Sequence, residues 1–361
     1  QPAYQYPLSR ADRASEVAFA FVRSECIGLR PYKAPLIHFP YEIFLFFATE
    51  LKEKGDAPVL KYAIRRIFML IPVILSVMFI LFSILYFTPG DPARIALGEE
   101  ATPETIESFR REHGLDDPFL VQFGRYVYNA VTKFDLGYSY NMKSPVSQEL
   151  AIRIPTTMKL AFAAVLFSTL LGLPLGILSA IRQYSLLDSV VTVFILLGVS
   201  MPTFWTGLLL ILAFSVKLGW LPSMGFDTLS EMVLPVVTLS GSSTALFAKM
   251  TRSSMLEVIK SDYIRTARAK GQKGSVVIWR HALPNALIPV MTIISMQFGT
   301  LLGGSIVTEA IFSISGVGRL MLDAINLRDY PIIQGGVLFI SMAYCFINLA
   351  VDLLYAVVDP R

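Results

Sequence analysis

Residues that could perform covalent or metal chemistry are few in this sequence. The three histidines, His38, His113 and His281, are not spaced with cysteines or carboxylates as metal ligands are. The two cysteines, Cys26 and Cys345, lie far apart and form no framework. No G-x-x-x-x-G-K-S/T phosphate loop is present, so the chain carries no sequence signature for ATP hydrolysis. We therefore expect no catalytic site, no metal site and no cofactor, and we expect that the chain is not an enzyme.

The residues whose spacing best suits a mechanical task form a basic segment, residues 250–284. Ser261 or Asp262 can cap the amino end of a first short helix, and Lys270 suits the negative end of its dipole. Gly271 can adopt the left-handed conformation that closes this helix. The bases of the segment are Arg252, Lys260, Arg265, Arg268, Lys270, Lys273 and Arg280.

The remainder of the basic segment predicts a second short helix. Ser275 can cap its start, and Pro284 is expected to end or bend it where the chain enters an apolar run. Two short helices joined by a hinge form a compact lever attached to an apolar helix. The alternative is that the segment has no mechanical role and that its positive charge serves only to fix the membrane topology.

Helix-disrupting residues interrupt several apolar runs and leave two interpretations open. Glycine and proline suit kinks and close helix crossings within a bundle, because neighbouring helices satisfy the freed carbonyls. The functional interpretation is that breaks after Gly198 and around Gly303 line a translocation path and flex during gating. The candidate path or gating residues are Ser200, Met201, Pro202, Gln297, Gly303 and Gly304.

The elements that carry these residues are apolar and long. The 361-residue chain is 54% hydrophobic and 16% charged, whereas soluble domains average about 25% charged residues. Runs of about 20 apolar residues suffice to cross a hydrocarbon core. The net charge of +4 does not indicate nucleic-acid binding, since the bases flank apolar runs instead of covering a polar, aromatic surface.

We predict an all-α polytopic membrane protein with about six transmembrane helices and an ordered external subdomain after the first helix. The predicted spans are 67–87, 158–180, 189–216, 232–249, 285–310 and 334–358. The middle thirds of the first five spans contain no ionisable residue, which disfavours coupling to an ion gradient.

The distribution of Lys and Arg predicts the orientation. Bases precede the first span at Lys61, Arg65 and Arg66 and fill the segment 250–284, so we expect both to face the cytoplasm. The segment 88–157 is then external, and the amino end of the first helix is cytoplasmic.

The spacing inside the basic segment resembles the loop of ATP-driven importer permeases, written Glu-Ala-Ala-x3-Gly-x9-Ile-x-Leu-Pro. The aligned residues are Arg265, Thr266, Ala267, Gly271, His281, Leu283 and Pro284. The sequence differs from this pattern at Arg265 and Thr266, and at His281 in place of the isoleucine. These differences fit the dipeptide/oligopeptide/nickel branch of the family. Segments such as Thr88-Pro89-Gly90-Asp91-Pro92 and Met201-Pro202-Thr203-Phe204-Trp205 extend the likeness to about residues 60 to 361 and indicate the first of the two permease subunits.

The resemblance implies a binding-protein-dependent transport component of a bacterial inner membrane. Its partners would be a second permease subunit in a heterodimer, two cytoplasmic ATPase subunits, an extracytoplasmic solute-binding protein and the lipid bilayer, with no nucleic acid. The segment 261–284, within the cytoplasmic coupling loop 250–284, would couple ATP hydrolysis to movement of the spans. A short peptide is the implied solute, with nickel complexes, glutathione and certain sugars as alternatives. An ATP-independent channel or secondary carrier and a membrane scaffold without transport remain rival functions.

The resemblance also divides the chain. The first transmembrane helix would occupy residues 59–87, the external subdomain 88–157, and the permease core with five further helices 158–361. Residues 1–58 lie outside the likeness, and their apolar piece 37–48 is too short to span a membrane. We expect this segment not to be part of the working protein.

Overall fold

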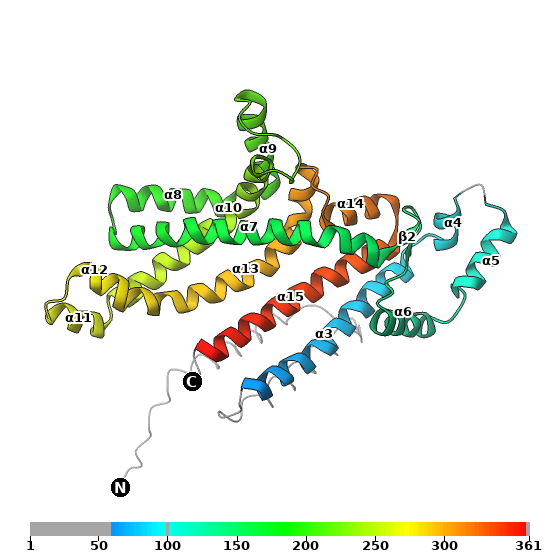
Figure 1. Ribbon diagram of the computed structural model, residues 1–361, viewed down its shortest axis with the longest axis horizontal. Helices are drawn as coiled ribbons and strands as arrows, with labels where there is room; N and C mark the ends of the chain where they lie inside the picture. The colour runs from blue at the N-terminus through cyan, green and yellow to red at the C-terminus, as the bar shows by residue number, and fades with distance from the viewer. Residues whose placement is uncertain (1–58, 99–100, 359–361) are drawn as a thin grey trace, which may run out of the picture. The chain divides into compact units, whose positions relative to one another are not determined.

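The computed structural model describes residues 59–98 and 101–358. The expectation for residues 1–58 lies outside these described residues. Helices dominate the described part of the chain, which confirms the all-α prediction, and a single two-stranded antiparallel hairpin pairs Tyr138 with Pro145. Figure 1 shows the arrangement of the helices.

The first helix of the described residues, α3 (Val59–Phe87), leads into the segment predicted to be an ordered subdomain, which does contain regular structure. Its elements are α4 (Pro92–Leu97), α5 (Pro103–His113), α6 (Phe119–Lys133), β1 (Tyr138–Ser139) and β2 (Ser144–Pro145). Aromatic side chains join α6 to α3, since the ring of Phe79 lies 5.7 Å from that of Phe119 and 5.3 Å from that of Phe123.

The remaining elements form a bundle. They are α7 (Val146–Ile181), α8 (Leu186–Ser200), α9 (Thr203–Leu210), η2 (Ile211–Lys217), α10 (Leu229–Ile259), α11 (Asp262–Ala269), α12 (Gly274–Val276), η3 (Val277–Ala282), α13 (Leu283–Ile311), α14 (Val317–Leu327) and α15 (Tyr330–Val358). The η elements are wide turns of the π type; η2 continues α9, and η3 connects α12 to α13 without a break.

The predicted spans correspond to five continuous helices and one bent pair of helices in the described residues. The continuous ones are long and apolar enough to cross a membrane, and α8 with the α9–η2 helix completes a sixth span if the pair counts as one. Several boundaries differ from the prediction, among them the start of the fifth span, whose continuous helix begins at Gly274. Helix α7 begins at Val146, inside the segment expected to be external, and α10 continues to Ile259, so Lys249 lies within it instead of at its end.

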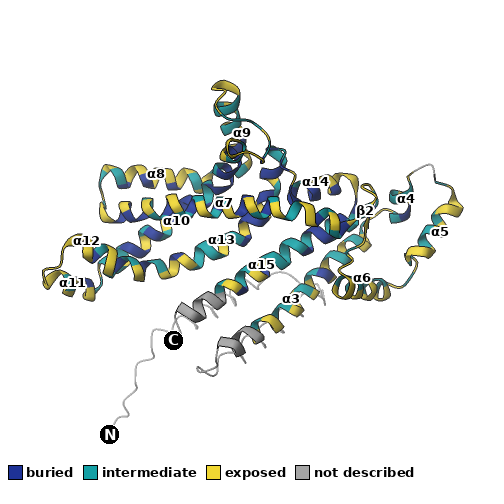
Figure 2. Cartoon of the chain, viewed as in Figure 1, coloured by how far each residue is buried: buried dark blue, intermediate teal, exposed yellow. Residues whose placement is uncertain are grey.

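Helix α10 forms the centre of the bundle. In its most apolar stretch 61% of the residues are buried, against 11% for α3, and α7, α8 and α13 all pack on it. Buried residues therefore gather where α10 faces α7 and α13, while the outer helices expose apolar side chains (Figure 2). A membrane protein exposes such apolar surface to lipid.

Small residues set the distance between α7 and α10. A methyl group on Gly172 would lie 2.9 Å from the Thr244 carbonyl oxygen, and one on Gly176 would lie 2.6 Å from that of Ala248. The glycines thus allow backbone contact, as small residues do between membrane helices. The close-crossing interpretation is correct for these two positions.

The bundle has two ends of different character. At one end, α11 and α12 adjoin the carboxyl end of α7, and at the other, the hairpin and α14 adjoin its amino end (Figure 1). The basic segment and the segment 88–145 are therefore attached to opposite ends of α7.

Candidate functional site

The basic segment begins as predicted with a short helix, but its cap differs from the prediction. Ser261 occupies the N-cap position of α11, yet its side chain makes no cap hydrogen bond. Its Oγ instead donates to the Val258 carbonyl at 2.6 Å, in the last turn of α10. Asp262 forms only a 3.6 Å ion pair with Arg265, and both side chains are largely exposed. The predicted side-chain cap is therefore wrong. Helix α10 continues until just before α11, and the Ser261 hydroxyl donates to a carbonyl in its last turn instead of accepting from an amide of α11.

Gly271 closes α11 in the left-handed conformation that the sequence predicts. Its φ is +74°, its amide donates to the Arg268 carbonyl at 3.0 Å, and the Gln272 amide donates to the Ala267 carbonyl at 3.4 Å. These two bonds make the six-to-one and five-to-two pattern of a Schellman motif. An added Cβ on Gly271 would meet no atom within 4 Å, so only backbone strain opposes a side chain there.

The predicted second short helix is in fact the start of a long one. Lys273, not Ser275, occupies the N-cap position, and the helix continues from Gly274 through Ile311 without interruption. Pro284 lies in the first turn of α13, directly after the π-type turns of η3. Those wider turns accommodate the ring where an α-helical interior would clash with it. The hinge is therefore the stretch Lys270–Lys273 alone.

His281 joins the two sides of this hinge. Its Nε2 lies 2.6 Å from the side-chain oxygen of Gln272, and its carbonyl accepts a hydrogen bond from the Asn285 side chain at 3.1 Å. Leu283 packs against the hydrophobic cluster that underlies α11. The structure thus brings Gly271, His281 and Leu283 into one contiguous region, as the sequence spacing predicts.

One buried side chain anchors α11 to the bundle. Ile264 is fully buried in a cluster that includes Ile177 of α7, Met255 of α10 and Val277 of η3. The sequence analysis missed Ile264, although it is the one large aliphatic residue in a mostly polar helix. The opposite surface of α11 is exposed, including Arg265 and Thr266, while Ala267 is half-buried. The arrangement leaves a short basic helix with a free outer face and a fixed inner one.

A buried ion pair near this anchor also escaped prediction. Arg252 donates from Nε to Asp188 Oδ1 at 2.8 Å and from Nη2 to Asp188 Oδ2 at 2.9 Å. Ser179 and the Tyr184 amide donate to the same carboxylate. The pair therefore ties the α7–α8 turn to α10. An acid at the start of an apolar run was the only signal for it in the sequence.

The break predicted at Ser200–Pro202 is present. Helix α8 ends at Ser200, Met201 and Pro202 are extended, and α9 leaves at an angle of 109° to α8. Pro202 cannot donate an amide hydrogen bond, and its ring disfavours a helical Met201. The sequence thus located a sharp break in an apolar run.

The predicted break around Gly303 is absent from the described structure. Gly303 and Gly304 lie in the uninterrupted helix α13, and an added Cβ on Gly303 would meet nothing within 4 Å. A glycine costs a helix only about 1 kcal/mol, so it does not break a segment whose backbone must be satisfied in lipid. Gln297 donates to Ser243 of α10 at 3.0 Å. No hydrogen bond described in the structure joins the α8–α9 break to these α13 residues.

A second buried acid, Glu309, organises the other end of the bundle. Its Oε1 accepts a hydrogen bond from Thr157 at 2.8 Å, and its Oε2 accepts one from the Arg319 amide at 3.0 Å. A Cβ on Gly316 would lie 2.4 Å from its carboxyl carbon. Glu309 thus holds α13, α7 and the start of α14 together. Sequence reasoning missed it, although an acid closing a long apolar run was visible.

Two family models match most of the chain. The model described as "Binding-protein-dependent transport system inner membrane component" matches residues 172–361. The model described as "Binding-prot-dependent transport system membrane comp, N-term" matches residues 59–161. The matched ranges include α11, Gly271 and the α8–α9 break.

Curated proteins of similar sequence have names that state a solute. The glutathione transport system permease protein GsiC of Pectobacterium atrosepticum is 44% identical over 301 residues, which cover 83% of this chain and 98% of that protein. The dipeptide transport system permease protein DppB of Alkalihalophilus pseudofirmus is 42% identical over 330 residues, which cover 84% and 99%.

A solved structure shares the fold. An inward facing conformation of the MetNI methionine ABC transporter aligns with a TM-score of 0.50 and 20% identity, over 58% of this chain and 96% of that one. At this identity the likeness concerns the fold alone.

Proposed function

The chain belongs to the family of inner-membrane components of binding-protein-dependent transport systems, and from this premise we propose that it forms part of the path by which an ATP-driven importer moves short peptides. The chain is a multi-pass permease subunit of the inner membrane and not a catalytic one. Partnership with another permease, with ATPases and with a binding protein follows from the family. The heterodimer with a second permease and the pair of cytoplasmic ATPases are part of the proposal.

The proposed class of solute rests on one observation. The two relatives described above are matched over 98% and 99% of their lengths, and their names state glutathione and dipeptides, which are both short peptides. Nickel complexes and sugars remain alternative solutes for the same path.

We propose that the outer face of α11 receives the ATPase. Arg265 and Thr266 lie on the exposed face of a helix whose inner side is fixed by Ile264 and partly by Ala267, so a push on the exposed face moves α7, α10 and α13 together. Gly271 and the His281–Gln272 contact fix the angle between this helix and α13. A rigid short helix transmits force better than a flexible loop.

We propose that the solute path passes the α8–α9 break and the open side of α13. Ser200 and Pro202 are exposed at the break, and Gly303 and Gly304 are exposed on α13. Extended backbone at membrane depth is tolerated where it lines a cavity or is buried in protein. Gln297, which binds Ser243, would hold α10 against α13 beside this path.

The proposed orientation places α11 in the cytoplasm and α5 outside. Its test is labelling of single cysteines by a membrane-impermeant maleimide in a chain in which Cys26 and Cys345 are replaced by serine. Cysteine at Glu112, exposed on α5, should react from outside, and cysteine at Ser275, exposed on α12, should not. The reverse pattern contradicts the orientation.

Reconstitution tests the function itself. The chain is purified with the products of its neighbouring permease and ATPase genes and placed in proteoliposomes with the associated solute-binding protein. Uptake of a labelled dipeptide or of glutathione should require ATP, the ATPases and the binding protein together. Uptake without ATPase would identify a channel or secondary carrier, and a stable complex without uptake of any of the proposed solutes would identify a scaffold.

A further inference from the structure

Helix α6 carries more apolar surface than its contact with α3 covers. Its side facing α3 presents Phe119, Phe123 and Tyr126, whose ring centroids lie 5.1 to 6.0 Å from those of Phe82 and Tyr86. The helical period places a second apolar group beside this contact, and that group is exposed. We call it the flank of α6, and its members are Leu120, Val121, Tyr128 and Val131.

The polar side of α6 is occupied by the turn that precedes the helix. Gln122 donates through Nε2 to the carbonyls of Leu115 and Asp117, both at 2.8 Å, and Arg125 pairs with the Asp117 carboxylate. The sequence of α6 contains no acidic residue, and its two charged residues, Arg125 and Lys133, are both basic. An amphipathic helix with a basic polar side suits the surface of an anionic bilayer.

The contact with α3 determines the depth at which α6 lies. Helix α3 is apolar as far as Phe87, and Phe79, which contacts Phe119 and Phe123, precedes that end by about two turns, or about 12 Å. Only 11% of the apolar stretch of α3 is buried in the described chain, so lipid surrounds most of it. A bilayer that covers the span of α3 therefore reaches α6, which lies beside the carboxyl-terminal part of α3 (Figure 1).

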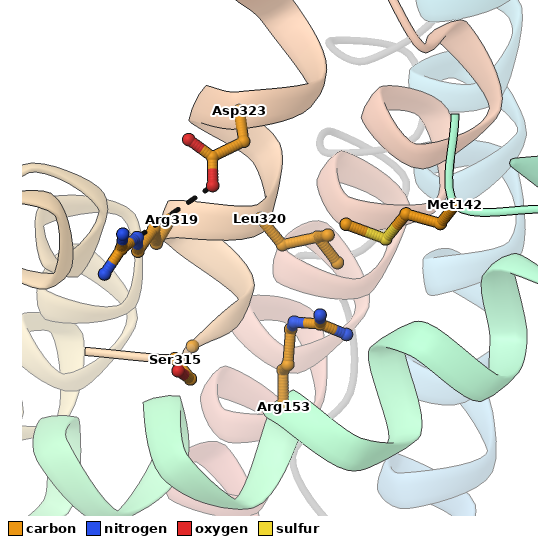
Figure 3. Close-up of a pocket in the computed structure, with 7 residues that line it drawn as sticks. Met142, Arg153, Ser315, Arg319, Leu320 and Asp323 are labelled. Atoms are coloured by element: carbon orange, nitrogen blue, oxygen red, sulfur yellow. Dashed lines mark ion pairs between the residues drawn. The ribbon is translucent and has the colours of Figure 1, made fainter. Parts of the chain in front are cut away.

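The walls of a notch beside the hairpin differ from the flank in their charge. The notch is lined by Met142, Arg153, Ser315, Gly316, Arg319, Leu320 and Asp323 (Figure 3). Arg319 and Asp323 are 39% and 54% exposed, and such charged side chains require water. In the flank, Leu120 and Val131 are 71% and 65% exposed, and the one polar atom of its side chains is the Tyr128 hydroxyl. The flank therefore suits lipid and the notch suits water.

We propose that α6 lies in the interface of the lipid bilayer and inserts its flank among the lipids. The Lys133 Nζ lies 5.9 Å from the centroid of the Tyr128 ring, which brings a positive charge and a phenol together. Tyrosine and lysine side chains place such polar ends at the level of the headgroups. The segment 88–157 is then external only in part, because α6 ties it to the membrane surface.

The test is site-directed spin labelling of the full chain, with Cys26 and Cys345 replaced by serine, in vesicles of phosphatidylethanolamine and phosphatidylglycerol. Collisions of a nitroxide with oxygen, which concentrates in lipid, and with a water-soluble nickel chelate are measured. Each sample is measured with and without the product of the neighbouring permease gene. The nitroxide is placed singly at Leu120 and Val131 of the flank, at Asn129 on the polar side of α6, and at Asp323 in the notch.

Oxygen collisions should exceed nickel collisions severalfold at Leu120 and Val131, at a depth of roughly 5–10 Å into the boundary between headgroups and acyl chains. Nickel collisions should dominate at Asn129 and Asp323. With the nitroxide at Leu120, Val131→Asp should shift the ratio severalfold toward nickel, because a carboxylate is unfavourable in lipid. Asn129→Asp, which adds the same charge on the polar side, should leave the ratio unchanged.

Three outcomes contradict the insertion of α6. Dominant nickel collisions at Leu120 and Val131, or an unchanged ratio in Val131→Asp, would place the flank in water. Few collisions with either reagent would show that another part of the chain covers the flank. A loss of oxygen collisions when the second permease is added would assign the flank to the interface between subunits. An absence of ATP-driven uptake would contradict the proposed function and would not bear on the contact with lipid.

Discussion

The guanidinium of Arg252 holds the carboxylate of Asp188 through two hydrogen bonds of 2.8 and 2.9 Å, with only 28% and 6% of the two side chains exposed. Asp188 belongs to the first turn of α8, and Arg252 lies near the end of α10, shortly before α11. The pair therefore makes the α7–α8 turn move with the helix that carries the proposed ATPase contact.

Breaking this pair should destabilise the chain more than removing it altogether. Arg252→Met leaves a buried carboxylate uncompensated, which costs about 3 kcal/mol, whereas the double variant with Asp188→Leu should recover most of that loss. Thermal unfolding in detergent measures both. The exposed pair of Arg111 and Glu107 is the control, because Arg111→Met there should cost less than about 1 kcal/mol. A double variant as unstable as the single one contradicts the prediction.

Replacement of Gly271 should separate transport from folding. Gly271→Val forces a β-branched residue to φ +74°, a strain of roughly 1–2 kcal/mol, while Gly271→Ala should be milder. The chain should still accumulate in the membrane, but uptake should fall far more than abundance because the angle of α11 changes. Gly274→Val is the matched control, since Gly274 has no neighbour within 4 Å and no positive φ. Normal uptake by Gly271→Val removes the reason for assigning coupling to this hinge.

Two alanine substitutions should differ because of helix packing. The new methyl group in Gly176→Ala lies 2.6 Å from the Ala248 carbonyl, so α7 and α10 must separate, at a cost of roughly 1–3 kcal/mol. Gly303→Ala meets no atom within 4 Å and should not lower the melting temperature, because alanine favours a helix over glycine by up to about 1 kcal/mol. Equal melting temperatures for the two variants would show that the glycines do not set the crossing of α7 and α10.

The outer segment should respond to acid through Asp91. Partial burial acts to raise the pKa of Asp91, but hydrogen bonds from Arg110 and the Ala93 amide, with the charges of Arg110 and Arg94, lower it below its ordinary value of 3.8. A lowered pKa stabilises the fold above the unfolded value, and this contribution disappears as pH falls through the folded value.

The measurement is the difference in melting temperature between the unaltered chain and Asp91→Asn from pH 7 to pH 3. The difference should be constant above about pH 5 and should shrink below pH 4, where protonation of Asp91 mimics the substitution. A difference that grows on acidification contradicts the sign of this pKa shift.

The sequence predicted features that depend on local geometry. The break at Met201–Pro202 and the left-handed Gly271 follow from steric properties of proline and glycine, and the structure has them. The close contact of α7 and α10 at Gly172 and Gly176 agrees with one of the two interpretations that the sequence left open for its helix-disrupting residues. The expected break at Gly303 failed because a glycine permits a break without requiring one.

Features that depend on helix register could not be predicted. Arg252 and Asp188 are 64 residues apart, and Thr157 and Glu309 are 152 apart, so each pair forms only after the rotation of α7, α10 and α13 is set. That rotation depends on how the helices pack, and their sequences are apolar on all sides, so they do not indicate which side of each helix faces its neighbours. The second short helix, which was expected to end or bend at Pro284, instead continues into α13 through the π-type turns of η3.

The most direct test of the account is a cross-link between α11 and an ATPase subunit. A cysteine at Thr266, exposed on the outer face of α11, carries a short photoactivated probe in the assembled importer, and a cysteine at Thr105 on α5 serves as the control. We predict that the Thr266 probe captures the ATPase with a yield that changes when ATP is bound, and that the Thr105 probe does not capture it. Absence of ATPase capture at Thr266, in a complex that still imports peptide, would contradict the assignment of α11 as the coupling helix.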